Sequence, residues 1–305
     1  MVAPSGQWEN ATAGAVAGFA TVAAMHPLDV VRTRFQVNDG RGLSALPTYK
    51  NTAHAVFTIA RLEGLRGLYA GFFPAVIGST LSWSLYFFFE RDTLEAGTMR
   101  NSPSLHLASA AEAGALVCLC TNPIWLVKTR LQLQTPLHQT PPYSGLLDAF
   151  RTIMKEEGPR ALFKGIVPGL VLVSHGAIQF TAYEELRKVI VDLKENRRKS
   201  ESTPDNLLNS ADYAALGGSS KVAAVLLTYP FQVIRARLQQ RPSTNGIPRY
   251  IDSLHVIRET ARFEGLRGFY RGLTANLLKN VPASSITFIV YENVLKLLKQ
   301  PPPTR

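Results

Sequence analysis

The chain contains a series of long apolar stretches, two of which are long enough to cross a membrane. Residues 67–89 contain no Asp, Glu, Lys or Arg over 23 positions, and residues 165–183 contain none over 19 positions. A helix needs about 20 apolar residues to span the hydrocarbon core of a bilayer. Shorter uncharged stretches, of 18, 15 and 13 positions, occur at 11–28, 113–127 and 222–234. Such lengths are expected of helices that turn one face toward water.

Amphipathic segments separate the members of each pair of long helices. They lie near 51–62, 146–156 and 252–263, and each is predicted to be a short helix on the membrane surface. These patterns predict an all-α membrane protein with six transmembrane helices, and an even number of crossings places both termini on the same side. The spacing Gly14-x-x-x-Gly18 predicts close packing of the first helix against a neighbouring helix of the same chain.

Three copies of one octet show that the chain is built from repeats. The octets read Pro-Leu-Asp-Val-Val-Arg-Thr-Arg at 27–34, Pro-Ile-Trp-Leu-Val-Lys-Thr-Arg at 123–130 and Pro-Phe-Gln-Val-Ile-Arg-Ala-Arg at 230–237. The prolines are 96 and 107 residues apart. A glutamine follows two residues after each octet: Gln36, Gln132 and Gln239.

Two further motifs follow every octet in the same order and at nearly the same spacing. A Glu-Gly pair comes 34 or 36 residues after each proline, at Glu63, Glu157 and Glu264. An aromatic residue and a glutamate close each copy, at Phe89-Glu90, Tyr183-Glu184 and Tyr291-Glu292. This agreement predicts three pseudo-threefold repeats, at 8–96, 104–193 and 209–299, with a polar, flexible linker at 194–208.

The octet prolines predict bends in the first helix of each repeat. A proline inside a helix removes one backbone hydrogen bond and bends the helix. Pro27, Pro123 and Pro230 occupy matching places, so three bent helices around a shared axis would bring the charged octet residues together at the bottom of a cavity. The alternative for one octet taken alone is a helix stop anchored at the lipid interface. The threefold recurrence favours the bends.

The composition fits a membrane protein with a wet interior. Hydrophobic residues make up 46% of the chain and charged residues 18%, below the roughly 25% charged residues of soluble chains. The formal net charge is +11, which suits anionic lipid, anionic solutes or nucleic acid. Because the basic residues recur at matched places in the repeats rather than in one tail, we expect no nucleic-acid partner.

No sequence pattern indicates an enzyme. The chain shows no paired carboxylates, no nucleophile with a neighbouring base, no metal-ligand spacing and no phosphate-binding loop, so we expect no cofactor and no metal. Two alternatives to a transporter remain: an interaction protein on a degenerate transporter scaffold, and a soluble scaffold of helical repeats.

The octet, the Glu-Gly motif and the closing motif, each present three times, resemble those of the mitochondrial carrier family. The resemblance covers about residues 8–298. It implies a monomer of three two-helix repeats with a central substrate site and two gates. It also implies membrane lipid, cardiolipin or another anionic lipid, as a partner. In this family the acidic octet position of one odd helix pairs with the basic position of the next, which closes the matrix or stroma side.

The resemblance implies a depleted gate on that side. Asp29 is expected to pair with Lys128. The other two acids are replaced while their basic partners remain: Trp125 faces Arg235, and Gln232 faces Arg32. Three glutamines fit the family's braces beneath the pairs: Gln36, Gln132 and Gln239. One ion pair in place of three predicts a weak gate.

The cytosolic gate implied by the resemblance is also incomplete. Three acids stand on the even-numbered helices: Glu90, Glu184 and Glu292. Of the matching basic positions only Arg187 is basic, so Glu90–Arg187 is the expected single pair. The alternative is that the three acids cap exposed helix ends.

Candidate substrate-binding residues lie at membrane depth. By resemblance Lys279 is one of three contact points, and repeat alignment places the other two near Ile77 and Val171. Further candidates are two ionisable residues and two ring-bearing side chains: Lys221, Glu112, Trp83 and His175. A lysine can meet a carboxylate or phosphate, and an apolar wall suits a flat heterocycle. Two alternatives stay open: Glu112 pairs with Lys221, and His175 is a satisfied core histidine.

The finer resemblance concerns the substrate. Trp125 in Pro123-Ile124-Trp125 is typical of the family's carriers of folate, FAD, NAD and pyrimidine nucleotides. Four stretches narrow the resemblance to the folate and FAD carriers: SAAEAGA, SHGAIQFTAYEEL, TYPFQVIRARLQ and SSITFIVYENV. This implies transport of an anionic, folate-like small molecule by alternating access, with FAD or NAD as the alternative. It implies a multi-pass protein of the chloroplast inner envelope, with the mitochondrial inner membrane as the alternative.

Overall fold

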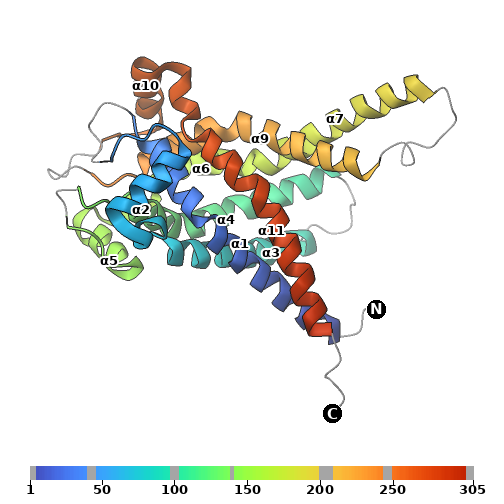
Figure 1. Cartoon of the computed structure of the whole chain (residues 1–305), viewed down its shortest axis with the longest axis horizontal. Helices are drawn as coiled ribbons and strands as arrows, with labels where there is room; N and C mark the ends of the chain where they lie inside the picture. The colour runs from blue at the N-terminus through green and yellow to red at the C-terminus, as the bar shows by residue number, and fades with distance from the viewer. Residues whose placement is uncertain are drawn as a thin grey trace, which may run out of the picture.

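The computed structural model describes residues 5–39, 46–96, 103–137, 141–198, 209–242 and 249–299, and these residues form helices and connecting segments without a strand (Figure 1). Three long helices each contain one octet proline. They are α1 (Ser5–Val37), α4 (Pro103–Gln132) and α9 (Ser210–Leu238).

A short surface helix follows each of these long helices, and a second long helical segment comes after it. The surface helices are α2 (Thr52–Leu68), α5 (Leu146–Glu156) and α10 (Ser253–Glu264), with the 3-10 turns η1 (Pro159–Phe163) and η3 (Gly265–Tyr270). The second long segments are α3 (Phe72–Ala96), α6 (Ile166–Val171) continuing through η2 (Leu172–Ser174) into α7 (His175–Arg198), and α11 (Leu273–Lys299). The all-α fold with interposed surface helices is therefore confirmed. The helix α7 extends into the predicted linker, whose residues 199–208 lie outside the described residues.

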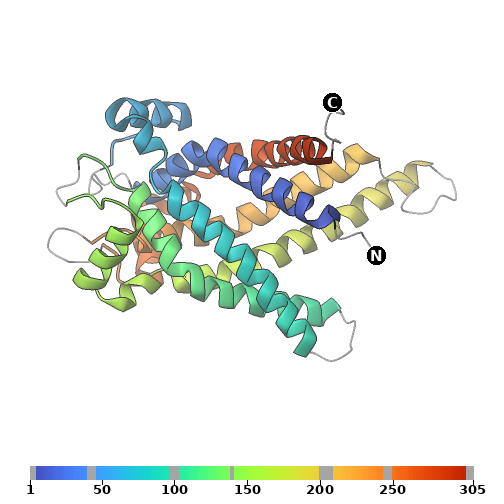
Figure 2. The same cartoon turned by 90° about the horizontal axis from the view of Figure 1, so that it is seen from below.

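The long helices pack in a closed ring. α3 packs along α4, α7 along α9 and α11 along α1, so the second long helix of each repeat lies against the first long helix of the next. The contact between α11 and α1 closes the ring. α1 begins and α11 ends at one end of the assembly, whereas α2, α5 and α10 gather at the other (Figures 1 and 2).

Three helical spans are long and apolar enough to cross a membrane: Thr12–Val37, Ser109–Gln132 and Pro159–Lys194. A fourth qualifies if α2 and the described part of α3 are counted as one span bent by 52°. In the part of the chain that the structure describes, α9 and α11 do not reach this apolar level, although they contain 29 and 27 residues. Each carries a lysine inside the helix, Lys221 near the middle of α9 and Lys279 in the second turn of α11, as expected of helices that border a polar interior.

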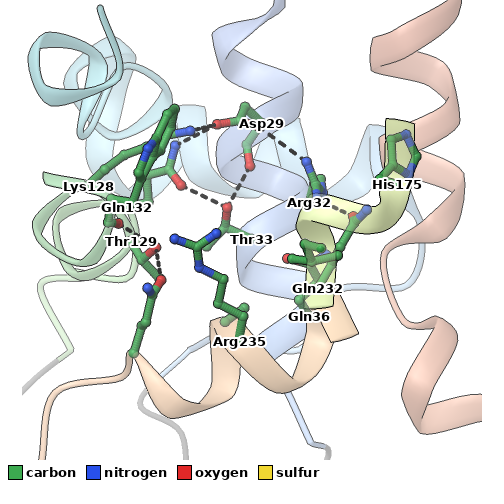
Figure 3. Close-up of a pocket in the computed structure, with 14 residues that line it drawn as sticks. Asp29, Arg32, Thr33, Gln36, Lys128, Thr129, Gln132, His175, Gln232 and Arg235 are labelled. Carbon is green, nitrogen blue, oxygen red and sulfur yellow. Dashed lines mark hydrogen bonds and ion pairs between the residues drawn. The ribbon is translucent and has the colours of Figure 1, made fainter. Parts of the chain in front are cut away.

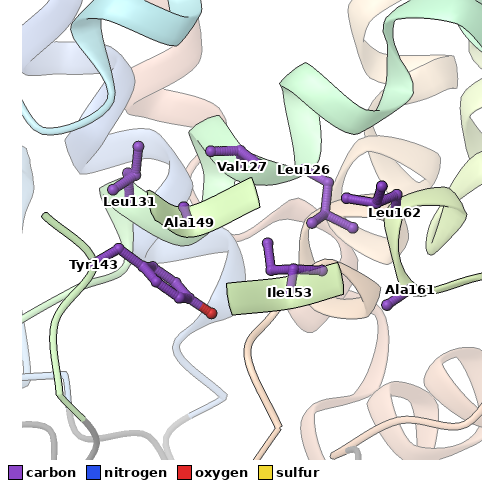
Figure 4. Close-up of a cluster of buried hydrophobic side chains, with 8 residues drawn as sticks. All are labelled: Leu126, Val127, Leu131, Tyr143, Ala149, Ile153, Ala161 and Leu162. Atoms are coloured by element: carbon purple, nitrogen blue, oxygen red, sulfur yellow. The ribbon is translucent and has the colours of Figure 1, made fainter. Parts of the chain in front are cut away.

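The buried apolar core lies beneath the surface helices. In the second repeat, Leu126 and Val127 of α4 pack with Ala149 and Ile153 of α5 and with Leu162 of η1 (Figure 4). Three apolar side chains of α5 remain exposed: Leu147, Phe150 and Met154. Similar clusters join α1 to α2 and α9 to α10. A helix with one buried apolar face and further exposed apolar side chains suits the interfacial region of a membrane, which agrees with the predicted surface position.

The residue before each octet proline anchors the second long helix of its own repeat. Its side chain makes a hydrogen bond with the backbone carbonyl oxygen just before the glycine at which that helix starts. The pairs are His26 with Ala70 (2.9 Å), Asn122 with Lys164 (3.4 Å) and Tyr229 with Arg271 (2.9 Å). The octet proline region of the first helix and the start of the second helix are thereby tied together.

Glycine is required where each second helix starts. Gly71, Gly165 and Gly272 have φ angles of +72°, +79° and +82°, in the left-handed region that residues with a Cβ avoid. A Cβ on Gly71 would lie 2.9 Å from the carbonyl oxygen of Lys128, and a Cβ on Gly272 would lie 3.0 Å from that of Arg32. Each start therefore packs directly on the octet of the following repeat.

The close packing predicted at Gly14 and Gly18 is wrong. Both residues are exposed, and no heavy atom outside their own helix lies within 4 Å of a Cβ built on either. α11 approaches α1 at other positions, such as Thr21, whose hydroxyl lies 2.8 Å from that of Thr287. The spacing of the two glycines fixes their common face but does not show which face meets the neighbouring helix.

We expect the substitution Gly71→Ala to destabilise the protein. A positive φ costs a residue with a Cβ about 1 kcal/mol, and the contact with the Lys128 carbonyl pushes the start of α3 away from α4. The melting temperature of the purified protein in detergent should fall by several degrees. Gly18→Ala is the matched control, because that helical glycine has open space around it, and its melting temperature should stay the same or rise slightly. Equal effects of the two substitutions would contradict the packing role of Gly71.

Candidate functional site

A cavity of about 350 Å³ lies where α1, α4 and α9 converge, with η2 and the start of α7 on one side (Figure 3). Most of its lining comes from the octets and the glutamines that follow them, so the three octets meet as the proline positions predicted. The lining residues are Asp29, Arg32, Thr33, Gln36, Trp125, Lys128, Thr129, Gln132, Leu172, His175, Gln232, Arg235, Ala236 and Gln239.

Asp29 is the centre of the hydrogen-bond network in this cavity. Its Oδ2 atom accepts from Lys128 Nζ at 2.6 Å and from Gln132 Nε2 at 3.0 Å. Its Oδ1 atom accepts from Lys279 Nζ at 2.7 Å, and Arg32 Nη1 lies 3.9 Å from the same oxygen. The structure thus contains the Asp29–Lys128 pair expected from the octets. It adds a second lysine, Lys279, which was expected to contact substrate.

The two octet positions without an acid leave their arginines in different surroundings. Arg32 donates to Oε1 of Gln232, the octet residue that it was expected to face. Arg235 donates to Oδ1 of Asn122 at 3.0 Å, and within the described ranges no carboxylate forms an ion pair with it. Among the described residues, Arg235 is therefore a cavity cation without an ion-paired carboxylate.

Trp125 occupies the acid position of the second octet. Its ring atoms lie 3.5 Å from a Cβ built on Gly78 of α3, so the indole packs on that glycine. The Nζ atom of Lys128 lies 4.9 Å from the centre of the ring, within the range of a cation–π interaction. Trp125 thus supports the lysine of the Asp29 pair.

The glutamines predicted as braces differ according to whether an acid is present. Gln132 donates to Asp29, the one remaining acid. Gln239 accepts from the Thr129 hydroxyl at 2.8 Å, but among the described residues its buried Nε2 atom has no hydrogen-bond partner. By threefold equivalence this nitrogen would donate to the acid that the second octet lacks.

His175 lines the cavity, whereas the other six predicted substrate-binding residues do not. Its Nδ1 atom lies 2.9 Å from the Thr228 hydroxyl, so the ring is both hydrogen-bonded and next to the cavity. Glu112 and Trp83 are exposed, and Lys221 is partly buried. No ion pair joins Glu112 to Lys221 in the described segments, which removes the mutual pairing that the sequence left open.

The predicted contact points near Ile77 and Val171 stay a prediction. Lys279 is the seventh residue after its repeat glycine, and the seventh residues of the other repeats are their neighbours Gly78 and Leu172. Leu172 lines the cavity, and Gly78 receives the Trp125 ring.

The residues predicted for the cytosolic gate are only partly described. The side chain of Glu90 lies outside the described residues, and the predicted pair with Arg187 lies outside them as well. Glu184 is partly buried and Glu292 is exposed. The role of the three acids stays a prediction.

Sequence reasoning missed a second ring of charges below the cavity. The last arginine of each octet is at most 2% exposed and forms a two-pronged ion pair with the Glu-Gly glutamate of its own repeat. The pairs are Arg34–Glu63, Arg130–Glu157 and Arg237–Glu264. The sequence pattern that could have predicted these ion pairs is the recurrence of both the arginine and the glutamate in all three repeats.

Each of these arginines also bonds the C-terminal end of the octet helix of the next repeat. Its Nε atom donates to the backbone carbonyl of the glutamine that follows the next octet, at 2.9 to 3.2 Å. The contacts are Arg34 to Gln132, Arg130 to Gln239 and Arg237 to Gln36. Because the last carbonyls of a helix lack intrahelical donors, the arginines satisfy them and link the three helices in a cycle.

The charges at the cavity favour an anionic ligand. Three cations line the cavity, Arg32, Lys128 and Arg235, and a fourth, Lys279, bonds Asp29, the one carboxylate among the lining residues. Cations in a partly buried site are costly unless they are paired or hydrated. No group of three or more His, Cys, Asp or Glu residues that would hold a metal ion occurs in the described part of the chain. The arrangement is suited to binding carboxylate or phosphate groups.

The comparison with protein families agrees with the threefold construction. A family model described as "Mitochondrial carrier protein" matches three times, at residues 4–95, 100–194 and 207–302.

Known relatives cover nearly the whole chain. "Folate transporter 1, chloroplastic" of Arabidopsis thaliana is 89% identical over 309 residues, which cover 100% of both chains. "Nicotinamide adenine dinucleotide transporter 2, mitochondrial" of the same plant is 37% identical over 299 residues, 95% of this chain and 80% of the relative. "Mitochondrial nicotinamide adenine dinucleotide transporter 1" of Saccharomyces cerevisiae is 37% identical over 290 residues, 93% of this chain and 75% of the relative.

We expect Glu157→Gln to destabilise the protein by about 3 kcal/mol or more, because it leaves the buried Arg130 guanidinium without its counter-charge. Burial would raise the pKa of Glu157, but Arg130 and Lys164 outweigh it and hold this pKa below its ordinary value. The contribution of the pair is therefore complete above the ordinary carboxyl pKa and is lost as pH falls through the lowered one. Thermal melts should show a constant deficit of the variant near neutral pH that narrows only in acid.

The matched control for that substitution is Glu185→Gln. Glu185 pairs with Lys188, and both side chains are 64% exposed, so the control should leave the melting temperature within error. A similar small effect of Glu157→Gln would show that the buried ring does not hold the helices together.

Proposed function

This chain belongs to the mitochondrial carrier family, and from that premise we propose that it moves folate and related monoglutamyl folates across an organelle inner membrane by alternating access. A carrier protein needs a central site that is open to one side at a time. The three family repeats, the closed ring of helices and the cavity at the octets supply such a site. The chain is a transporter rather than an enzyme.

The observation that carries the substrate class is the excess of cations at the cavity. Folate is a flat heterocycle with two carboxylates on its glutamate, so it offers anionic groups to Lys279, Arg235 and Arg32. The relative that is 89% identical is named for folate transport, which favours folate over a dinucleotide. FAD or NAD is the second candidate, because two phosphate groups suit the same cations and the relatives at 37% identity are named for NAD transport.

The remaining predicted contacts complete the proposed substrate site. His175 lines the cavity, which supports a proposed contact with the polar edge of the heterocycle. We propose that five further residues contact the substrate in conformations with a larger cavity. They are Lys221, Glu112, Trp83, Val171 and Ile77.

The octet residues form the proposed gate on the matrix or stroma side. The Asp29–Lys128 pair joins α1 to α4 and the Arg32–Gln232 hydrogen bond joins α1 to α9, which supports the proposal that these contacts close the gate. Opening separates these contacts while the proposed cytosolic gate closes. The residues proposed for the cytosolic gate are Glu90, Glu184, Arg187 and Glu292. A single octet ion pair makes the first step less costly than three would.

The proposed setting is the chloroplast inner envelope, in agreement with the name of the Arabidopsis relative. We propose that the protein works as a monomer, since one chain closes the ring of helices by itself. The exposed apolar side chains of the surface helices and the net charge of +11 support contact with anionic lipid such as cardiolipin.

The proposed function is tested by uptake into liposomes that contain the purified protein. Labelled 5-formyltetrahydrofolate, folate, FAD and NAD are offered singly and then in competition. We expect uptake of the folates above the rate of protein-free liposomes, with little inhibition by the dinucleotides. Preferred uptake of FAD or NAD would overturn the folate assignment, and no uptake of any of them would favour an interaction protein.

The depleted gate predicts transport without strict exchange. Because one ion pair closes the gate, we expect folate to enter empty liposomes at a rate within about tenfold of the rate into liposomes preloaded with folate, a difference of about 1.4 kcal/mol in the barrier. The measurement compares initial uptake rates under the two conditions. Uptake that requires internal folate in a one-to-one ratio would contradict this reading of the gate.

A further inference from the structure

We infer that Lys279 is an exchangeable partner of Asp29: it holds the gate carboxylate while the carrier is empty and transfers to a substrate carboxylate on loading. The inference rests on the proposed function and assigns a coupling step to the same site. Its basis is that one lysine, expected to meet substrate, is already bonded to the single acid of the gate.

The two lysines on Asp29 act on different oxygens and different helices. Lys128 of α4 and Gln132 bond Oδ2, whereas Lys279 of α11 bonds Oδ1 at 2.7 Å. The only other cation near Oδ1 is Arg32, at 3.9 Å in the described structure, and it already donates to Gln232. Loss of Lys279 therefore leaves Oδ1 without a close donor while the bond to α4 remains.

A substrate carboxylate would compete with Asp29 for this ammonium group. Two carboxylates on one lysine lie only a few ångströms apart, and like charges at that distance repel strongly in a partly buried site. The arrival of an anion at Lys279 therefore weakens its bond to Asp29 even if the lysine stays between them. The side chain of Lys279 is 22% exposed, so it remains accessible to an incoming ligand.

Only the third repeat can supply this exchange. The equivalent positions, counted from the repeat glycines, hold Gly78 and Leu172, which have no charged group. The single exchangeable cation lies beside the single gate acid, across the contact between α11 and α1 that closes the ring. Loading is thereby connected to the one ion pair that keeps the gate shut.

Thermodynamic linkage makes the inference testable by binding alone. If folate weakens the Lys279–Asp29 bond, then weakening that bond by mutation must strengthen folate binding. Asp29→Asn is nearly isosteric and removes the charge that holds Lys279. We expect it to lower the folate Kd by about fivefold or more, measured by isothermal titration calorimetry on the purified protein in detergent.

A double-mutant cycle identifies Lys279 as the cause. Lys279→Met should raise the folate Kd, and adding Asp29→Asn to Lys279→Met should give no further tightening. Lys128→Met is the matched control: it breaks the same gate from the α4 side but leaves Lys279 on Asp29, so folate binding should not tighten. The dimethyl ester of folate, which lacks the glutamate charges, should bind Asp29→Asn and the unmodified protein equally.

The possible outcomes are distinct. Tightening by Asp29→Asn that disappears in the Lys279→Met background supports the exchange. Equal tightening by Asp29→Asn and Lys128→Met, or none by Asp29→Asn, overturns it, because the effect then comes from gate opening or is absent. Failure of the unmodified protein to bind or transport any folate would instead overturn the proposed function. Circular dichroism melts of each variant confirm that the compared proteins are folded.

Discussion

The structure depends on a cycle of buried arginines that join the ends of the three octet helices, α1, α4 and α9. Each octet helix ends in carbonyl groups that have no donor within the helix. An arginine from the preceding helix supplies that donor, and a glutamate of the arginine's own repeat balances its charge. Because the donor and the acceptor belong to different helices, no single repeat can satisfy its own ends. The requirement explains why the three repeats close into a ring.

The ring is symmetric in its supports and asymmetric in its cavity. All three repeats keep the buried ion pair, the glycine with positive φ and the side chain that anchors it. The acid of the octet remains only at Asp29. Where the other two acids are lost, the described residues give the Nε2 atom of Gln239 no hydrogen-bond partner and Arg235 no ion-paired carboxylate. The buried Arg–Glu pairs hold the scaffold, and they do not include the octet residues that line the cavity. The scaffold can therefore tolerate the loss of two acids in the cavity.

Charge imbalance in the cavity connects the scaffold to transport. A site with four cations and one carboxylate is costly when empty and is stabilised by an anion. The same imbalance would be destabilising in a soluble protein with no ligand to offset it. Here the one remaining acid takes donors from α4 and from α11. The contacts that keep the cavity closed are therefore close to those that an anionic substrate would use.

The sequence by itself determined the helical class, the three repeats and the positions at which the octets meet, because hydrophobic length and motif spacing are properties of the chain in one dimension. The resemblance to a known family, carried by the three octets, further implied that Asp29 meets Lys128 and that Gln232 meets Arg32. Only the tertiary structure showed that Lys279 bonds Asp29, that Gly14 and Gly18 face away from α11, and that Glu112 does not pair with Lys221. Each of these depends on the rotation of one helix against its neighbour, which side-chain packing across the ring decides and which no spacing within a single helix records.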